Sequence, residues 1–207
     1  MSNVPSVYVC SIDIFSGKST LCLGLALRLR DEGYKVGYFK PVGWEMARGP
    51  KGEIIDEDAH LMRSVLGLDL PLDTLVPVIF NSRFLEEGSK MYSDYYEKRL
   101  LRAYDEASRG MDLMVLEGPH TLGIGAFAGI DPGSIAKKLE SQLVLVSRVE
   151  SDVEIDQLIR EYKAVQAAGV DLLGAVLNIV PKPVVERIRW FALPILRKHR
   201  VNILGIV

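Results

Sequence analysis

Short runs of apolar residues alternate along this chain with segments of helical length, and this alternation restricts its fold more than any other feature. Residues 6–12, SVYVCSI, are rich in β-branched and aromatic residues and predict a buried strand. Residues 17–31 follow as an amphipathic helix that ends near Gly33. Because apolar strands alternate with helices, we expect an α/β fold with a doubly wound, mainly parallel sheet that is covered on both faces.

The same pattern continues to the end of the chain, with prolines marking two interruptions. We expect the strand over residues 35–42 to stop at Pro41 and the last helix to be kinked or interrupted at Pro194. Residues 67–90 are less regular. The other expected strands cover residues 111–118, 142–149, 172–180 and 201–207, and the other expected helices cover residues 55–67, 91–110, 131–140, 151–168 and 183–199.

Composition restricts the class of protein. The chain has 207 residues, of which 48% are hydrophobic and 25% charged, so we expect residues 1–207 to form one globular domain. The net charge of −2 gives no reason to expect nucleic acid or an anionic membrane as a partner. No apolar run is long enough to span a bilayer and no signal peptide is recognisable, so we expect a cytoplasmic protein whose Cys10 and Cys22 are buried, reduced thiols.

The motif Ser16-Gly17-Lys18-Ser19 lies between the first strand and the first helix, which is the context of a phosphate-binding loop (P-loop). Unpaired N–H groups at a helix N-terminus attract phosphate, a lysine adds a positive charge on the β- and γ-phosphates, and a serine hydroxyl can bind Mg²⁺. The alternative is a chance Gly-Lys-Ser at a helix start. The predicted nucleotide-binding residues of the loop are Asp13, Ser16, Gly17, Lys18, Ser19 and Thr20.

Four further polar residues lie at ends of expected strands or helices. In parallel sheets ligands bind at the carboxyl ends of the strands, so Lys40 is a candidate for an anionic substrate group and Glu117 for Mg²⁺. Asp58 belongs to an acidic helix start that the helix dipole alone would explain. Asn178 could pair with an adenine edge or cap the following turn. Lys40 could equally be a solvated lysine at a strand end.

The histidines do not predict a metal centre. His60, His120 and His199 have no metal-ligand spacing, and we interpret them as surface or loop residues. His120 follows the Glu117 motif closely enough to contact a ligand there.

Taken in order, the segments SIDIFSGKST, GYKVGYFKPVG, DEDAHLM, MVLEGPHTLGIG, IAKKL and GAVLNIVPKP resemble the dethiobiotin synthetase family. The chain more closely resembles the BioD-like P-loop domain at the N-terminus of some phosphotransacetylases. The resemblance covers nearly the whole chain and implies a doubly wound P-loop fold that binds ATP and Mg²⁺. It further implies that Gly17, Lys18 and Ser19 bind the ATP phosphates, that Ser19, Asp58 and Glu117 hold Mg²⁺, that Lys40 acts with Lys18 on the substrate, and that Asn178 contacts adenine.

Three features depart from the synthetase pattern. The usual loop begins with a glycine five residues before Gly17, where this chain has Ile12. If the loop is one residue longer, its first position is Ser11, which then replaces that glycine. Phe15 stands where a glycine or another small residue is usual, and a phenylalanine there can narrow the phosphate cradle. The segment EGPHTLGIG after the strand is bulkier than the synthetase segment, which argues against a diamine substrate.

Two functional hypotheses remain open. The first is an ATP-dependent ligase that acts on a small carboxylate or carbamate. The second is a regulatory domain that senses a nucleotide or metabolite and is associated with phosphotransacetylase. This hypothesis agrees with the apolar strand at the end of the chain, which we expect if the chain is the N-terminal part of a longer polypeptide. A cobyrinate amidase-like synthetase ranks lowest, because no glutaminase domain fits in this length.

Family members often form homodimers, so the resemblance implies a homodimer. Tyr92, Tyr95 and Tyr96 either form its interface or are partly buried residues.

Overall fold

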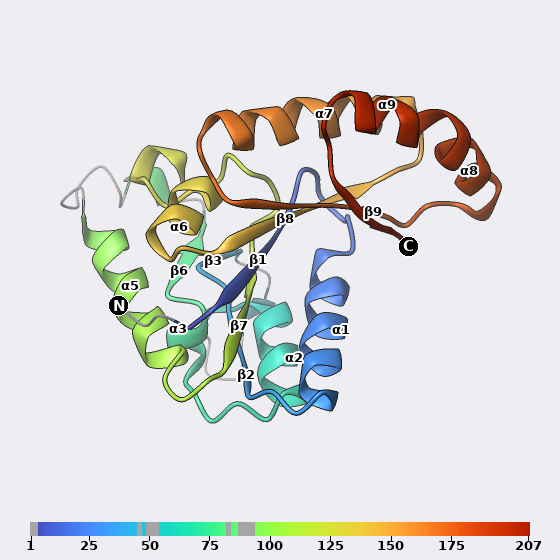
Figure 1. The fold of residues 1–207 in the computed structure, drawn as a ribbon. Helices are drawn as coiled ribbons and strands as arrows, with labels where there is room; N and C mark the ends of the chain where they lie inside the picture. Colours follow the sequence, from blue (N-terminus) through green and yellow to red (C-terminus); the bar gives the residue numbers. More distant parts are fainter. Residues whose placement is uncertain (1–3, 45–46, 49–53, 82–83, 87–93) are drawn as a thin grey trace.

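A parallel six-stranded sheet organises the molecule (Figure 1). The structure is a computed structural model, and it describes residues 4–44, 47–48, 54–81, 84–86 and 94–207. The sheet has the strand order β10-β9-β8-β1-β7-β2. On one side of β1 the strands β8, β9 and β10 follow in chain order, and on the other side β7 lies between β1 and β2, so the sheet extends on both sides of β1 as expected for a doubly wound fold. The strands are β1 (Ser6–Ser11), β2 (Val36–Phe39), β7 (Leu113–Glu117), β8 (Gln142–Arg148), β9 (Leu172–Asn178) and β10 (Ile203–Ile206).

Helices cover both faces of this sheet (Figure 1). The helices α1 (Lys18–Asp31) and α2 (Glu57–Val65) lie on one face. The other face carries α5 (Tyr95–Ala107), α6 (Pro132–Lys138), α7 (Asp152–Ala167), α8 (Lys182–Arg187) and α9 (Leu193–Lys198). Two short helices, α3 (Leu72–Leu75) and a 3₁₀ turn at Ala126–Ala128, lie in the connections.

The C-terminal helical segment is interrupted as the proline predicted. A π-helical stretch, Ile188–Ala192, separates α8 from α9, and Pro194 lies in the first turn of α9. Proline has no N–H to donate to the preceding turn, so the regular α-helical ladder cannot run through it. The wider π turn presents Trp190 and Phe191 to solvent, with 73% and 69% of their surfaces exposed.

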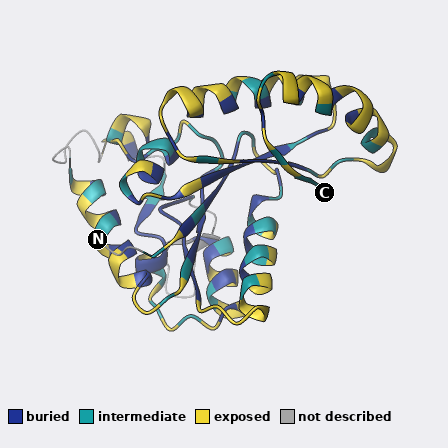
Figure 2. Ribbon diagram, in the orientation of Figure 1, coloured by how far each residue is buried: buried dark blue, intermediate teal, exposed yellow. Residues whose placement is uncertain are grey.

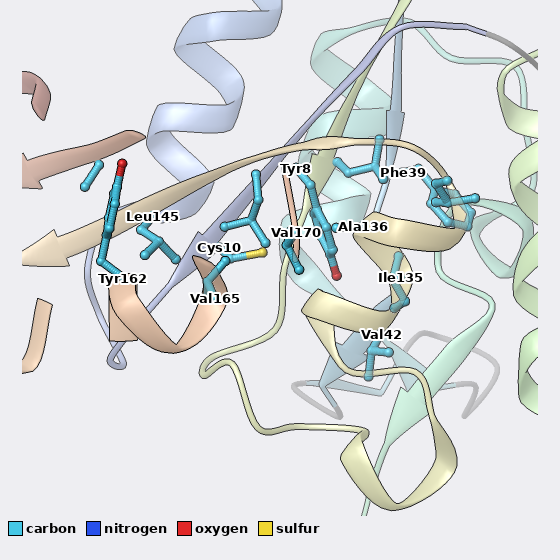
Figure 3. Packing of buried hydrophobic residues seen from close by; sticks show 14 of the residues in the cluster. Tyr8, Cys10, Phe39, Val42, Ile135, Ala136, Leu145, Tyr162, Val165 and Val170 are labelled. Carbon is cyan, nitrogen blue, oxygen red and sulfur yellow. The ribbon is translucent and has the colours of Figure 1, made fainter. Parts of the chain in front are cut away.

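Alternation along the central strand divides the core into two layers. Tyr8 and Cys10 point toward the layer that contains Ile135 and Val165 from the helices of that face (Figure 3). Val9, between them, points into the other layer with α1 and α2. The central strands are therefore dark blue along almost their whole length in Figure 2, as a sheet buried on both faces requires.

Both cysteines are buried and unbonded. Cys10 lies in one layer and Cys22 of α1 in the other, and neither forms a disulfide. Burial raises the pKa of the Cys10 thiol, and Glu117 raises it further while Lys18 opposes the shift. Burial likewise raises the pKa of Cys22. The prediction of buried thiols is confirmed.

Two short strands that the pattern did not indicate lie outside the main sheet, and one of them, β6 (Val78–Phe80), falls in the region expected to be irregular. After Pro41 ends β2, the chain forms β3 (Val42–Trp44), which pairs in parallel with β6 (Val78–Phe80). A further antiparallel pair joins β4 (Ala47–Arg48) and β5 (Ile54–Ile55). The three-residue strands are too short for periodicity to identify, but β3 places Trp44 at the carboxyl edge of the main sheet.

The tyrosines proposed as an interface differ in their positions. Tyr96 is 9% exposed and packs in the core against Phe84, with ring centroids 5.2 Å apart. Tyr95 is 39% exposed, and Tyr92 lies outside the described residues. Partial burial, the alternative interpretation, therefore accounts for Tyr96.

None of the helices in the described ranges is long and apolar enough to cross a membrane.

Candidate nucleotide-binding site

The P-loop turns sharply between β1 and α1 at Gly17. This residue has φ of +77°, in the left-handed region, and a Cβ there would lie 2.4 Å from the Asn178 Nδ2 atom. Only glycine fits such a position. The Asn178 side chain, at the end of β9, donates from Nδ2 to the carbonyl of Ser16 at 2.8 Å. Asn178 therefore holds the loop, a role distinct from the two expected from the sequence.

Lys18 and Ser19 begin α1 and meet the acid that ends β7. Lys18 Nζ donates to Glu117 Oε1 at 3.0 Å, and Ser19 Oγ donates to the same oxygen at 2.9 Å. Glu117 is fully buried and Lys18 is 6% exposed. A strand-end carboxylate therefore occupies the two P-loop side chains that would otherwise face phosphate or Mg²⁺.

Lys40 extends this network away from the P-loop. Its Nζ atom donates to Asp56 Oδ1 at 2.8 Å and to Asp58 Oδ2 at 3.0 Å, and it lies 3.4 Å from Glu117 Oε1. Tyr38 completes the surroundings of Glu117 by donating from its hydroxyl to Oε2 at 2.9 Å. Lys40 is 4% exposed, so the interpretation as a solvated lysine is wrong.

Asp56 was not among the predicted site residues, although it is the closer acidic partner of Lys40. It is the N-cap of α2, and its Oδ1 atom accepts from the Ala59 N–H at 3.0 Å. Its Oδ2 atom accepts from the Trp44 N–H at 3.1 Å. The acidic motif Asp-Glu-Asp was recognisable in the sequence. The sequence alone does not tell an aspartate that only caps a helix from one that also pairs with a lysine.

The charges of this network stabilise one another. Burial alone would raise the pKa of Glu117, but Lys40, Lys18 and the bond from Ser19 lower it to about 2. Burial lowers the pKa of Lys40, whereas Glu117, Asp56 and Asp58 raise it by more, so the net pKa is raised. Buried charges persist when they are paired and hydrogen-bonded in this way. The carboxylate and the lysine are therefore both ionised at neutral pH.

The two unusual loop residues, Ser11 and Phe15, differ in burial. The Ser11 side chain is buried, and its hydroxyl donates toward the carbonyls of His120 at 3.2 Å and Pro119 at 3.4 Å. It thereby ties the start of the loop to the segment after β7. Phe15 has φ of +56° and is 75% exposed, so its ring lies largely in solvent.

Asp13 lies on the opposite side of the loop, toward the end of β8. Partial burial and the negative charge of Glu154 raise its pKa to about 6, although Arg148 acts in the other direction. Its Oδ1 atom is buried without a hydrogen-bond partner in the part of the chain that the structure describes. The remaining predicted loop residues differ in exposure, since Ser16 is buried and Thr20 is exposed.

An aromatic group that the sequence did not predict lies beside the two lysines. The Trp44 ring stacks on Phe80, with centroids 4.9 Å apart, and meets His120 at 5.1 Å. Burial, Lys18 and Lys40 lower the pKa of His120, so it is neutral at pH 7. His60 is exposed, and His199 lies far from this group beside Lys163.

The predicted Mg²⁺ ligands Ser19, Asp58 and Glu117 converge on this network. Glu117 contacts Ser19 directly and is joined to Asp58 through Lys40. A hydroxyl and two carboxylates are the hard oxygen donors that Mg²⁺ prefers, and the ion commonly keeps water and phosphate as its other ligands. The donor set therefore fits Mg²⁺, although the described residues contain no ready cluster of three or more His, Cys, Asp or Glu side chains around a metal position.

Known proteins resemble this chain along most of its length. The sequence model of a family described as an AAA domain matches residues 5–207. A phosphate acetyltransferase of Deinococcus radiodurans is 28% identical over 172 residues, which are 80% of this chain and 23% of that protein. The ATP-dependent dethiobiotin synthetase BioD of Aquifex aeolicus is 25% identical over 176 residues, which are 82% of this chain and 74% of that protein.

Solved structures with little sequence identity share the fold. The MinC:MinD cell division protein complex of Aquifex aeolicus matches at 16% identity with a TM-score of 0.57, covering 99% of this chain and 81% of that chain. The kinase domain of Escherichia coli tyrosine kinase ETK matches at 18% identity with a TM-score of 0.52, covering 88% and 70%. These matches show an α/β P-loop fold and nothing further.

The chain spans about a quarter of the length of the phosphate acetyltransferases that it matches. It covers about three-quarters of the dethiobiotin synthetases of Aquifex aeolicus and Methanocaldococcus jannaschii. Since the family match covers all but the first four residues, the chain belongs to this AAA domain family and is a dethiobiotin synthetase-like (BioD-like) P-loop domain.

Proposed function

We propose that this domain binds ATP with Mg²⁺ and acts as an ATP-dependent ligase on a small carboxylate or carbamate. The observation that supports this most directly is the contact of Lys18, Ser19 and Lys40 with one buried acid, Glu117. Two ammonium groups held at the carboxyl edge of a parallel sheet suit a reaction in which negative charge develops on transferred phosphoryl oxygens.

Each predicted residue has a role in this proposal. Gly17, Lys18 and the first turn of α1 would bind the phosphates, because phosphate oxygens can replace Glu117 as the partner of Lys18. Ser19, Asp58 and Glu117 would hold Mg²⁺, which would neutralise charge on the phosphates. Lys40 would face the anionic group of the substrate. Asn178 uses one amide hydrogen on the P-loop, and its remaining polar atoms are available for adenine.

Calorimetric titration with a non-hydrolysable ATP analogue tests the nucleotide site. We expect saturable binding that strengthens with Mg²⁺ and falls at least tenfold in Lys18→Ala, because the variant lacks the charge on the phosphates. Lys98→Ala is the control, since Lys98 is an exposed lysine paired with Asp94 on α5. Ser19→Ala, which removes a Mg²⁺ ligand and leaves Lys18 in place, should lose the Mg²⁺ dependence. Equal affinity in the wild type and Lys18→Ala would contradict the proposal.

A regulatory domain is the second candidate function. It is favoured by the relatives, because this chain matches about a quarter of several phosphate acetyltransferases, and residues 1–207 would then form one domain of a longer protein. Release of ADP from ATP in the presence of a small carboxylate supports the ligase. Tight nucleotide binding without such turnover supports the regulatory domain. Sedimentation of the same sample measures whether a homodimer forms, as we expect from the family resemblance.

A further inference from the structure

A cavity of about 250 Å³ lies apart from the P-loop, and residues of α2, α3, α5 and β6 line it. α3 and β6 both pack against α5 on this side of the molecule (Figure 1). Lys18, Lys40 and Glu117 are not among the described residues that line the cavity. Sites for drug-sized ligands measure roughly 300–1,000 Å³, so this cavity has room for a smaller metabolite.

The inner wall of the cavity is apolar. Val76 and Val78 are 5% and 3% exposed, and Ala59 of α2 is fully buried. Leu72 and Pro77 extend the same wall. Such a wall offers no hydrogen-bond partner, and a polar group that enters without one loses its hydration. The part of a ligand that enters the cavity must therefore be apolar.

Asp56 is the buried charged residue of the lining, but its charge is already paired. Its Oδ1 atom accepts from Lys40 at 2.8 Å and from the Ala59 N–H at 3.0 Å. Its Oδ2 atom accepts from the Trp44 N–H at 3.1 Å. We therefore assign the ligand no contact with this carboxylate.

Free charges of both signs lie at the mouth of the cavity. Asp73 of α3 and Arg99 of α5 both line it and are exposed, and neither forms an ion pair in the part of the chain that the structure describes. The neighbours Glu97 and Lys98 on α5 are already paired. Tyr95 lies four residues before Arg99, so both side chains project from the same face of α5.

We propose that this cavity is a second small-molecule site, which binds an amino acid with an apolar side chain. The ligand carboxylate would accept from Arg99, because the guanidinium fork matches a carboxylate. The ligand ammonium group would donate to Asp73, and the side chain would enter between Val76 and Val78. A ligand with a single charge could use only one of the two free charges. The inference goes beyond the proposed function, since no P-loop contact takes part in it.

Calorimetric titration of the full chain with L-valine, without nucleotide or Mg²⁺, tests the site. We expect saturable binding at millimolar concentrations, because both charged contacts lie near solvent. Isobutylamine is valine without its carboxylate, and isovalerate is valine without its ammonium group. Each should bind more weakly by about fivefold or more, since each loses one charged contact. L-Aspartate should also bind more weakly, because its side-chain carboxylate would face the apolar wall.

Variants of the two free charges place the binding in this cavity. Arg99→Ala and Asp73→Asn change exposed side chains, so both proteins should fold, and each should bind L-valine more weakly by about fivefold or more. Arg102→Ala is the matched control, because Arg102 is an exposed arginine of α5 that is not among the described lining residues. It should bind L-valine as the wild type does.

The outcomes are independent of the nucleotide site. Saturable L-valine binding that weakens in Arg99→Ala and Asp73→Asn, but not in Arg102→Ala, supports the proposal. The absence of saturable binding overturns it, as does equal affinity for isobutylamine or isovalerate, or unchanged L-valine affinity in Arg99→Ala or Asp73→Asn. Failure of the ATP analogue to bind overturns the proposed function alone, because the L-valine titration contains no nucleotide.

Discussion

Glu117 and Asp13 lie on opposite sides of the P-loop, and their surroundings shift their pKa values in opposite directions. Burial acts on both, but Lys40 and Lys18 lower the pKa of Glu117 to about 2. The pKa of Asp13 is raised to about 6 by its partial burial and by Glu154, and one of its buried oxygens has no partner in the described part of the chain.

The difference shows that the two sides of the P-loop differ in how many fixed hydrogen-bond donors surround their acid. On the side of β7 and β2, Glu117 accepts from Lys18, Ser19 and Tyr38, so charged groups are fixed before any ligand arrives. Such fixed dipoles and charges need no reorganisation when a phosphate binds. On the side of β8, Asp13 has no comparable set of donors. We infer that the first side carries phosphate and Mg²⁺ binding, and the following predictions test that division.

Truncation of the two acids should give the largest contrast. Glu117→Ala leaves Lys18 and Lys40 buried next to an empty position, and removal of one partner of a buried pair costs about 3–5 kcal/mol. Asp13→Ala removes an acid whose raised pKa means that its ionised form destabilises the folded chain at pH 7, so the free energy of unfolding should stay the same or rise. Urea unfolding at pH 7 measures both. Equal losses would show that the two sides are organised alike.

The pH dependence of stability should differ in sign at the two acids, measured without nucleotide or Mg²⁺. The pKa of Glu117 falls from 4.5 to about 2 on folding, so its contribution is complete above pH 4.5 and is lost as the pH falls toward 2. The expected loss is about 3 kcal/mol. Asp13 behaves oppositely, because its pKa rises from 3.8 to about 6, and stability should increase as the pH falls through 6.

Asp13→Asn provides the control for that experiment. It should abolish the gain between pH 6 and pH 4 and leave the loss below pH 4.5 unchanged, because Glu117 is untouched. Urea unfolding at several pH values from 7 to 2 measures both effects. A gain that persists in Asp13→Asn must come from another group.

The sequence predicted the main sheet well because its strands are apolar along their length and separated by helices of ordinary size. It missed β3 and β6, since strands such as Val42–Trp44 are too short to show a period. Their pairing joins segments more than thirty residues apart, and only the folded chain brings them together.

The site was predictable where it depends on strand ends. Lys18, Lys40 and Glu117 had to lie at one edge because parallel strands share their direction, and the structure places them in contact. Tyr38 and Trp44 were not predictable, since their roles depend on the direction of single side chains. The sequence suggested that Asn178 contacts adenine or caps a turn. Its hydrogen bond to the Ser16 carbonyl could not be predicted, because it depends on the geometry of the folded loop.

Removal of the Asn178 amide should have a smaller effect than removal of Glu117. Asn178→Ala deletes the bond to the Ser16 carbonyl, so we expect a loss of about 1 kcal/mol in stability and weaker binding of the ATP analogue. Asn202→Ala is a matched control, because Asn202 also donates its amide to a backbone carbonyl, that of Leu173, but far along the chain from the P-loop. If both variants bind the analogue equally well, Asn178 does not position the loop.

Substitution of Phe15 should have the smallest effect and the opposite sign. Its φ of +56° is costly for a bulky residue but not for glycine, and its ring is 75% exposed, so Phe15→Gly should stabilise the protein by about 0.5–1 kcal/mol. Phe15→Ala is the control, because it removes the ring but keeps the Cβ and hence the strain, and it should give no gain. Neither variant should change affinity for the ATP analogue if the ring lies outside the cradle. Tighter binding in both variants would instead show that the ring obstructs the phosphates.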